Sequence, residues 1–281
     1  MRLIAIPLVL ALLCGAVLSA GQASGAQDSS GTVVDALVDI GGRRLHVSCS
    51  GVGSPTVILE AGMGESAATW KTIQPAVAEF TRVCAYDRAG RGTSDPDPRK
   101  EFRTARVVVD DLGNLLQKAS ITAPYILVGH SFGGAYIRGF AAKFPRDTVG
   151  MVLVDSTHEN QYARFASTGY VLPPMPPDQN PERTDVVAAL EEIAREKWRA
   201  DIPLIVLTHG RAIAAQAFPN VTPEQAARIE DLWRQLQGEL ARRSSQGRLG
   251  VAEKSGHYVH YEEPGLVVQA IRDVVTAARK K

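Results

Sequence analysis

Apolar residues along this chain follow two alternating patterns: short unbroken runs, and longer segments in which they recur at helical spacing. The short runs are rich in valine, isoleucine and leucine and end at glycine, proline or charged residues, which is typical of buried strands. The first run predicts a hairpin that turns at Gly41 and Gly42, and with six further runs it makes eight strands. The six further runs lie at residues 55–62, 81–88, 124–130, 148–156, 202–210 and 248–256.

Between these runs, apolar residues recur every three to four positions, as on a helix with one buried face. We expect helices at about 67–80, 104–119, 132–144, 223–243 and 263–278. Strands that alternate with helices predict a mostly parallel sheet with helices on both faces. Continuous apolar runs such as MVLV and LIVL suit strands buried on both sides. The predicted fold class is therefore α/β.

One interval, residues 157–200, breaks the alternation. It contains the segment YVLPPMPPDQNPE, whose prolines disfavour both helix and strand, and then a helix predicted at 184–198. Because the interval follows the sixth strand, we expect an insertion that folds over the strand ends as a lid. A surface excursion without a role in binding is the alternative.

The first 26 residues have the features of a secretory signal peptide: an early cation at Arg2, an apolar run at residues 3–18 and small residues up to Ala26. Pro7 and Gly15 interrupt the run, which is short for a membrane span, so an uncleaved membrane anchor is the less favoured alternative. We therefore expect residues 27–281 to form one domain that is secreted or periplasmic, with no stable membrane span.

The overall composition disfavours several classes of partner. Of the 281 residues, 45% are hydrophobic and 22% charged, and the formal net charge is +1. This is the composition of an ordinary globular protein, with no excess of either charge to attract nucleic acid or a charged membrane surface. We expect a small-molecule ligand instead, and the composition leaves the oligomeric state open.

The sequence ILVGHSFGG contains the main candidate for chemistry, Ser131. It lies where a predicted strand ends and a predicted helix begins, and residues 129–133 match the G-x-S-x-G pattern of a nucleophilic serine on a strand-to-helix turn. A glycine-rich chain produces this pentad by chance, and serine is also a common helix cap. The motif therefore needs support from its surroundings.

Four segments, in order, resemble landmarks of the α/β-hydrolase superfamily. PTVILEAGMGES resembles the third strand and its oxyanion loop, TRVCAYDRAGRGTSD the fourth strand with a D-x-x-G-x-G-x-S turn, VGHSFGG the nucleophile elbow, and SGHYVHYEEP the histidine loop before the last helix. The resemblance extends from residue 33 to the C-terminus. It implies the α/β-hydrolase fold, an eight-stranded mostly parallel sheet flanked by helices, and a serine hydrolase that cleaves carboxylic esters or similar small acyl substrates without a cofactor.

The resemblance also assigns roles. Ser131 would be the nucleophile and His257 its general base, while the backbone amides of Phe132 and Met63 would form the oxyanion hole. The fold would place the second strand beside the fourth, so Cys49 and Cys84 would face each other. In an oxidising compartment these cysteines form either a disulfide or two buried thiols.

The other five histidines compete less well for the role of base. His260 is interpreted as a partly buried structural residue, His130 as a neighbour on the oxyanion side, and His209 as the end of the seventh strand. The weakest candidates are His46 and His158.

The position of the catalytic acid departs from the family pattern. Many relatives carry an aspartate after the seventh strand, but here that strand continues into THGRAIAAQAF, which contains no carboxylate. Asp155, which closes the sixth strand, is the predicted acid, since some lipases and dehalogenases of this fold carry it there. A helix-capping role is the alternative for Asp155, Glu159 is the reserve candidate, and Asp201 precedes its strand at the wrong end of the sheet.

Other chemistries are disfavoured or left open by the residues present. Dehalogenases and epoxide hydrolases of this fold use an aspartate at the elbow, where this chain has Ser131. Motifs of the H-E-x-x-H or C-x-x-C type, which would indicate a metal site, are missing from the sequence. A proline-type aminopeptidase remains an alternative, although its relatives usually have tryptophan where this chain has Phe132. A catalytically silent binding protein on the same scaffold is the second alternative.

Overall fold

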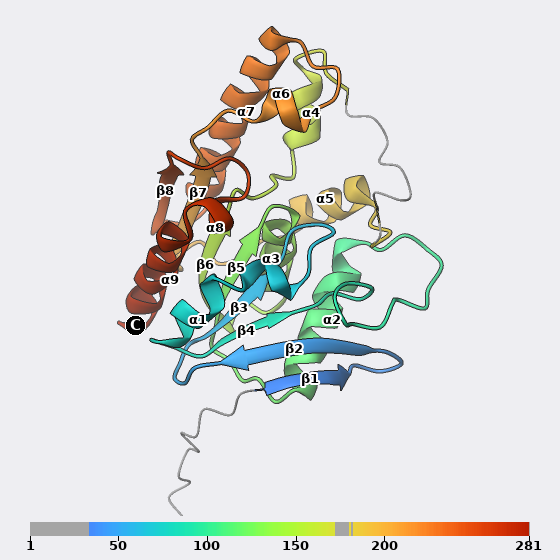
Figure 1. Ribbon diagram of the computed structural model, residues 1–281, viewed down its shortest axis with the longest axis vertical. Helices are drawn as coiled ribbons and strands as arrows, with labels where there is room; N and C mark the ends of the chain where they lie inside the picture. Colours follow the sequence, from blue (N-terminus) through green and yellow to red (C-terminus); the bar gives the residue numbers. More distant parts are fainter. Residues whose placement is uncertain (1–33, 172–179, 181, 281) are drawn as a thin grey trace, which may run out of the picture.

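The computed structural model describes residues 34–171, 180 and 182–280, and a single eight-stranded sheet runs through this part of the chain (Figure 1). The predicted signal peptide and most of the proline-rich segment lie outside the described residues. The strand order is β1-β2-β4-β3-β5-β6-β7-β8. The strands are β1 (Val34–Asp39), β2 (Arg44–Ser50), β3 (Thr56–Glu60), β4 (Val83–Tyr86), β5 (Tyr125–His130), β6 (Thr148–Val154), β7 (Leu204–His209) and β8 (Gly247–Ala252).

Strand β2 is antiparallel to both of its neighbours, β1 and β4, and the pairs from β4 to β8 are parallel. Helices pack on both faces of this sheet (Figure 1). They are α1 (Ile73–Ala78), α2 (Ala105–Lys118), α3 (Phe132–Lys143), α4 (Gln161–Ala166), α5 (Val186–Arg195), α6 (Ala214–Ala217), α7 (Pro223–Ala241), α8 (Val259–Glu262) and α9 (Pro264–Ala278). The predicted fold class is confirmed.

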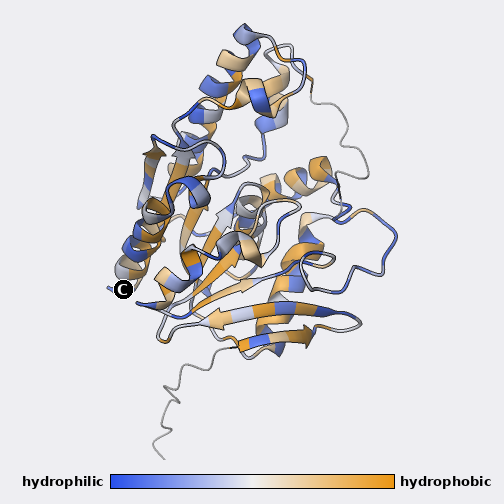
Figure 2. Cartoon of the chain, in the orientation of Figure 1, coloured by the Kyte–Doolittle hydropathy of each residue, from blue (hydrophilic) through white to orange (hydrophobic). Residues whose placement is uncertain are grey.

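The alternation of side chains along each strand divides the core into two layers. Ile58 of β3 belongs to a cluster with α2, α3 and α7, whereas its neighbours Val57 and Leu59 pack with α1 and α9 on the other face. Successive strand residues point to opposite faces, so strands with helices on both sides must be apolar throughout. Figure 2 shows this concentration of hydrophobic residues on the central strands.

The predicted helix at 67–80 is wrong as a single element. The structure has a short 3-10 helix, Ala67–Trp70, and then α1. Pro75 explains the break, because proline lacks an N–H and its ring clashes with the carbonyl four residues earlier, so it is tolerated only in the first turn of a helix. The short helices α4, α6 and α8 were not predicted, since four to six residues are too few to show a helical period.

The predicted insertion contains α4 and α5, which pack in different places. Helix α5 lies against α2 and α3, whereas α4 packs with α6 and α7 beyond the sheet edge (Figure 1). This second group has its own apolar core, which we call the upper cluster: Phe165, Tyr170, Ala214, Ala226, Ile229, Trp233 and Leu236. A role of this region as a lid stays a prediction.

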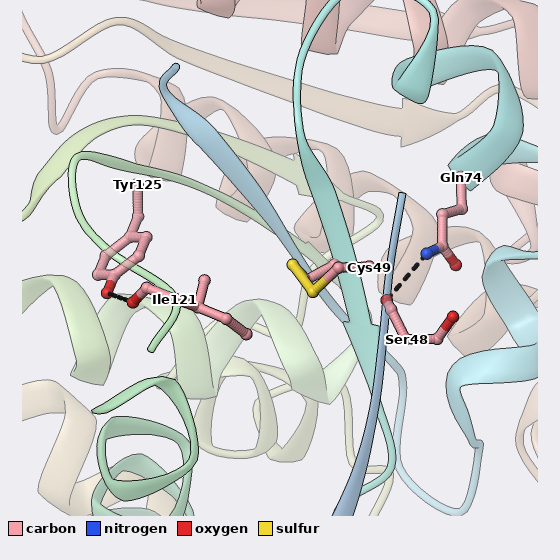
Figure 3. Close-up of a disulfide and its surroundings, with 6 residues drawn as sticks. Ser48, Cys49, Gln74, Ile121 and Tyr125 are labelled. Carbon is pink, nitrogen blue, oxygen red and sulfur yellow. Dashed lines mark hydrogen bonds between the residues drawn. A yellow bond between two sulfur atoms is a disulfide. The ribbon is translucent and has the colours of Figure 1, made fainter. Parts of the chain in front are cut away.

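A disulfide joins Cys49 on β2 to Cys84 on β4 (Figure 3). The two residues are directly opposite in the antiparallel register, and both are buried in the core. Beside the bridge, the side chain of Gln74 donates to the carbonyl of Ser48 at 2.9 Å.

Within the described residues, none of the helices has the length and apolar character needed to cross a bilayer.

Candidate active site

Ser131 occupies the turn between β5 and α3 in a backbone conformation that residues with a side chain rarely adopt. Its φ is 51° and its ψ is −125°, and the geometry around it requires glycine on both sides. A Cβ on Gly129 would lie 2.7 Å from the backbone of Gly134, and one on Gly133 would lie 2.3 Å from the carbonyl oxygen of Ala61. Strained backbone of this kind is concentrated at functional sites, where the surrounding structure holds it in place.

The structure brings Ser131, His257 and Asp155 into one hydrogen-bonded row. Nε2 of His257 lies 2.9 Å from Oγ of Ser131, and its Nδ1 lies 2.6 Å from Oδ2 of Asp155. Ser131 follows β5 and Asp155 follows β6, and these strands are parallel neighbours, so both turns reach the same sheet edge. His257 comes from the segment between β8 and α8. Three distant segments thus meet with the geometry of a nucleophile, a base and an orienting acid.

The two other candidate acids are placed elsewhere. The carboxylate of Glu159 is bound by two guanidinium groups, those of Arg138 at 3.0 Å and Arg243. Asp201 precedes β7 and pairs with Arg199 at 2.7 Å. Asp155 is the candidate that hydrogen-bonds to His257.

His209 also contacts Asp155, which the sequence did not predict. Its Nδ1 lies 2.9 Å from each carboxylate oxygen of Asp155, and its Nε2 lies 3.0 Å from Oε2 of Glu230 on α7. Trp233, one turn further along α7, donates from Nε1 to Oδ1 of Asp155 at 2.9 Å. The sequence did contain a signal for this contact. His209 ends the strand next to β6, at the position where many relatives carry the catalytic acid, so its side chain could be expected near Asp155.

These contacts determine the charge of Asp155, the candidate acid. Burial by itself raises the pKa of Asp155, but hydrogen bonds from His209 and His257 outweigh that effect and bring its pKa below the usual value. Asp155 is fully buried, so a carboxylate there needs such partners to remain ionised. The predicted acid is therefore an anion that accepts hydrogen bonds from several directions.

On the other side of His257 lie two more buried histidines, His130 and His260. Nδ1 of His130 lies 3.0 Å from Oε2 of Glu65, its Nε2 lies 3.1 Å from the carbonyl oxygen of His257, and Nε2 of His260 lies 2.9 Å from Oγ1 of Thr69. Burial lowers the pKa of His130, and it lowers that of His260 to about 3. This arrangement braces the loop that carries His257 with largely neutral rings.

Glu65, His130 and His260 also bring one potential metal-ligand atom each within 4.8 Å of one another. Imidazole and carboxylate are suitable donors for several divalent metals. In the structure, however, Glu65 and His130 bind each other, and the same carboxylate oxygen accepts from the amide of Gly62 at 2.8 Å. The contacts of these groups are those of a hydrogen-bond network.

The residues predicted for the oxyanion hole lie beside Ser131. Phe132 is the first residue of α3, and Met63 follows β3 in a loop whose next residue, Gly64, donates its amide to Glu182 at 2.7 Å. Phe132 and Met63 both line the cavity that contains Ser131. Their role as amide donors stays a prediction.

The cavity at the hydroxyl of Ser131 has a volume of about 790 Å³. Ser131 and His257 line this cavity together with residues of α6, α7 and the segment before α6. Most of the surrounding side chains are apolar or aromatic, including Tyr162, Ile213, Phe218, Ile229 and Trp233. Such a cavity suits an organic ligand of modest size.

Comparisons with known proteins agree with this architecture. Residues 57–270 match the family described as "Alpha/beta hydrolase family". The protein YqjL of Bacillus subtilis is 31% identical over 239 residues, which cover 81% of this chain and 86% of that protein. An "AB hydrolase superfamily protein" of Gibberella zeae is 26% identical over 282 residues, covering 80% of this chain and 87% of that protein.

Solved structures show the same fold at low sequence identity. A thermophilic esterase from Thermogutta terrifontis has a TM-score of 0.58 at 20% identity, with 88% of this chain and 98% of that chain covered. An epoxide hydrolase from Vigna radiata has a TM-score of 0.64 at 14% identity, with coverages of 87% and 99%. Identities this low support a shared fold and leave the reaction to be inferred from the site.

Proposed function

Since this chain belongs to the α/β hydrolase family, we propose that it is a serine hydrolase that cleaves carboxylic esters, or similar small acyl substrates, through an acyl-enzyme on Ser131. The observation that carries the proposal is the row of hydrogen bonds from the hydroxyl of Ser131 through the imidazole of His257 to Asp155, at the wall of the cavity.

The chemistry follows from the order of these groups. His257 takes the hydroxyl proton on Nε2 as the oxygen of Ser131 attacks the carbonyl carbon, and the carbonyl oxygen becomes an oxyanion. The same nitrogen returns the proton to the leaving alcohol, and water then releases the acyl group by the reverse sequence. Asp155 keeps a proton on Nδ1 and stabilises the imidazolium that forms.

The oxyanion would be bound by the amides of Phe132 and Met63. The amide of Phe132 is at the N-terminus of α3, where backbone N–H groups and the helix dipole favour negative charge. Loss of one such donor typically removes about 3 kcal/mol of transition-state stabilisation.

The cavity lining favours an uncharged substrate with an apolar acyl or alcohol group. Apolar and aromatic side chains of the upper cluster and α6 line the same cavity as Ser131. The charged pair near the opening, Arg211 and Glu262, is internally neutralised by its salt bridge. The epoxide hydrolase neighbour shares the fold, but a carboxylate nucleophile does not occupy the elbow of this chain.

A fluorophosphonate probe tests the reaction directly. We expect it to label the wild-type protein on Ser131 and to leave the Ser131→Ala variant unlabelled, with loss of p-nitrophenyl ester hydrolysis to background. A comparison of acetyl, butyryl and octanoyl esters then ranks the acyl groups that the cavity accepts. A folded wild-type protein that neither reacts with the probe nor turns over any ester would indicate a silent binding protein instead.

We also propose that the protein is exported. The N-terminal 26 residues have the features of a signal peptide, and a disulfide such as that between Cys49 and Cys84 is typical of oxidising compartments. Cell fractionation followed by N-terminal sequencing should find a shortened chain outside the cytoplasm. A full-length chain confined to the cytoplasm would contradict this.

A further inference from the structure

A second histidine is bound to the candidate acid, and it lies between two carboxylates. The ring of His209 has Asp155 on one side, with Nδ1 at 2.9 Å from both oxygens, and Glu230 on the other, with Nε2 at 3.0 Å. The ring is buried, with 3% of its side chain exposed. Solvent therefore does little to screen its charge interactions.

The partners of the two carboxylates show that both are acceptors. Oε1 of Glu230 accepts from the amides of Ile213 at 2.6 Å and Ala214 at 2.7 Å, which leaves Oε2 for His209. The oxygens of Asp155 receive N–H groups from His257, His209 and Trp233. Carboxylates that are surrounded by donors in this way are ionised.

A neutral imidazole has one N–H and one lone pair, so in this place it would turn a lone pair toward an anionic oxygen at about 3 Å. Only the imidazolium, with a proton on each nitrogen, donates to both carboxylates. Burial lowers the pKa of His209, but hydrogen bonds to Asp155 and Glu230 outweigh that effect and raise it to about 9. Geometry and electrostatics thus agree on the charge of the ring.

We propose that His209 is a positioning residue of this site: its imidazolium, held between Asp155 and Glu230, keeps the acid ionised and turned toward the candidate base. The role rests on the proposed function, because His209 acts on the reaction only through Asp155 and His257. The charges of Asp155, His209 and Glu230 sum to one negative charge, the same as for a lone carboxylate. The base therefore still meets a net negative partner when it takes a proton.

The same contacts connect the acid to the wall of the cavity. Glu230 accepts from the amides of Ile213 and Ala214, which line the cavity, while Trp233 of the upper cluster both lines the cavity and donates to Asp155. Helix α7 thus fixes the acid and shapes the substrate pocket with one face.

The test uses nuclear magnetic resonance of the full chain labelled with 15N-histidine. The Glu230→Gln variant keeps the shape and an oxygen for the two amides but removes the negative charge. We expect both ring nitrogens of His209 to be protonated at pH 7.5 in the wild type. In the variant, the midpoint of the His209 titration should lie at least about one pH unit lower. The spectrum of His209→Asn identifies the resonances. A neutral ring in the wild type, or an unchanged titration in Glu230→Gln, would overturn the proposal.

Kinetics provide the second arm, with p-nitrophenyl esters as substrates. In His209→Asn the side-chain amide still donates to Asp155, but the positive charge is gone and two negative charges remain near His257. We expect kcat to fall about 10- to 100-fold with KM nearly unchanged, and the acidic limb of the kcat/KM profile to move to higher pH, because extra negative charge favours the imidazolium form of the candidate base. His158→Asn, another buried histidine, is the control and should not move the limb.

An unmoved limb in a folded His209→Asn protein would reduce His209 to a structural role. If wild type lacks esterase activity, the proposed function fails, yet the titration of His209 by resonance still decides its charge state. The two hypotheses can therefore fail separately.

Discussion

The two sides of His257 hold buried histidines in opposite charge states. On the acid side, His209 lies between two carboxylates, and its pKa is raised to about 9. On the other side, His130 has one carboxylate, Glu65, and one neutral carbonyl, and burial lowers its pKa. The comparison indicates that burial outweighs the effect of one carboxylate on the pKa of a ring, and that a second carboxylate reverses the outcome. The side with His209 therefore places charged groups next to the site, whereas the side with His130 mainly holds the loop of His257 in place.

The largest expected effect comes from replacing the candidate acid, Asp155. Asp155→Asn retains the shape but cannot hold His257 in the required tautomer, so we expect ester hydrolysis to fall about 10⁴-fold. Glu159→Gln is the matched control, since its carboxylate binds Arg138 and Arg243, and its rate should change little. A large loss of rate in Glu159→Gln and little loss in Asp155→Asn would show that Asp155 is not the catalytic acid. The proposed difference between the two sides of His257 would then be wrong.

The next effect is on stability at alkaline pH. The folded-state pKa of His209, about 9, is above its ordinary value of 6.5, so its contribution is fully present below about pH 6.5 and is lost as the pH rises through about 9. Urea unfolding should show a larger loss of stability between pH 7 and pH 10 for the wild type than for Glu230→Gln. This subtraction cancels the lysines and tyrosines that titrate in the same range. Equal losses of stability in the two proteins would mean that Glu230 does not keep His209 protonated.

The Glu65 side has the opposite pH dependence. Hydrogen bonding to His130 lowers the pKa of Glu65 to about 2 against the effect of burial, so its contribution is present above about pH 4.5 and disappears as the pH falls toward 2. The two sides of the site should therefore weaken at opposite ends of the pH range.

The smallest expected effect is that of Glu65→Gln. The amide oxygen can still accept from Gly62 and His130, and its N–H₂ group can meet Thr69, so the network keeps its hydrogen bonds. We expect the esterase rate to stay within about threefold of wild type, because no charge is delivered from this side. A loss comparable to that of Asp155→Asn would show that the two sides are equivalent after all.

Much of the fold was predictable because it depends on local pattern. The buried strands appear as unbroken apolar runs, and the helices at 105–118, 132–143, 223–241 and 264–278 appear as periodic segments close to their expected bounds. The split at Pro75 and the short helices were missed, because a few residues carry too little periodicity and their positions depend on packing.

The candidate site shows the same division. Gly129, Ser131 and Gly133 lie within five consecutive residues, so a local sequence motif is enough to predict the strained turn. Asp155 was inferred from the end of its strand and from the lack of a carboxylate after the next one. His209 and Glu230 were not found, because their partnership depends on which face of α7 turns toward the strand ends.

The sequence by itself determined the alternation of strands and helices, the glycine-flanked serine and the positions of the polar residues that end each strand, because these follow from backbone sterics and local periodicity. Tertiary structure decided which of those residues meet and which of them are charged. Hydrogen bonds and charge interactions act over a few ångströms, and residues 131, 155, 209, 230 and 257 come within that range only when the sheet is assembled and α7 packs beside its edge.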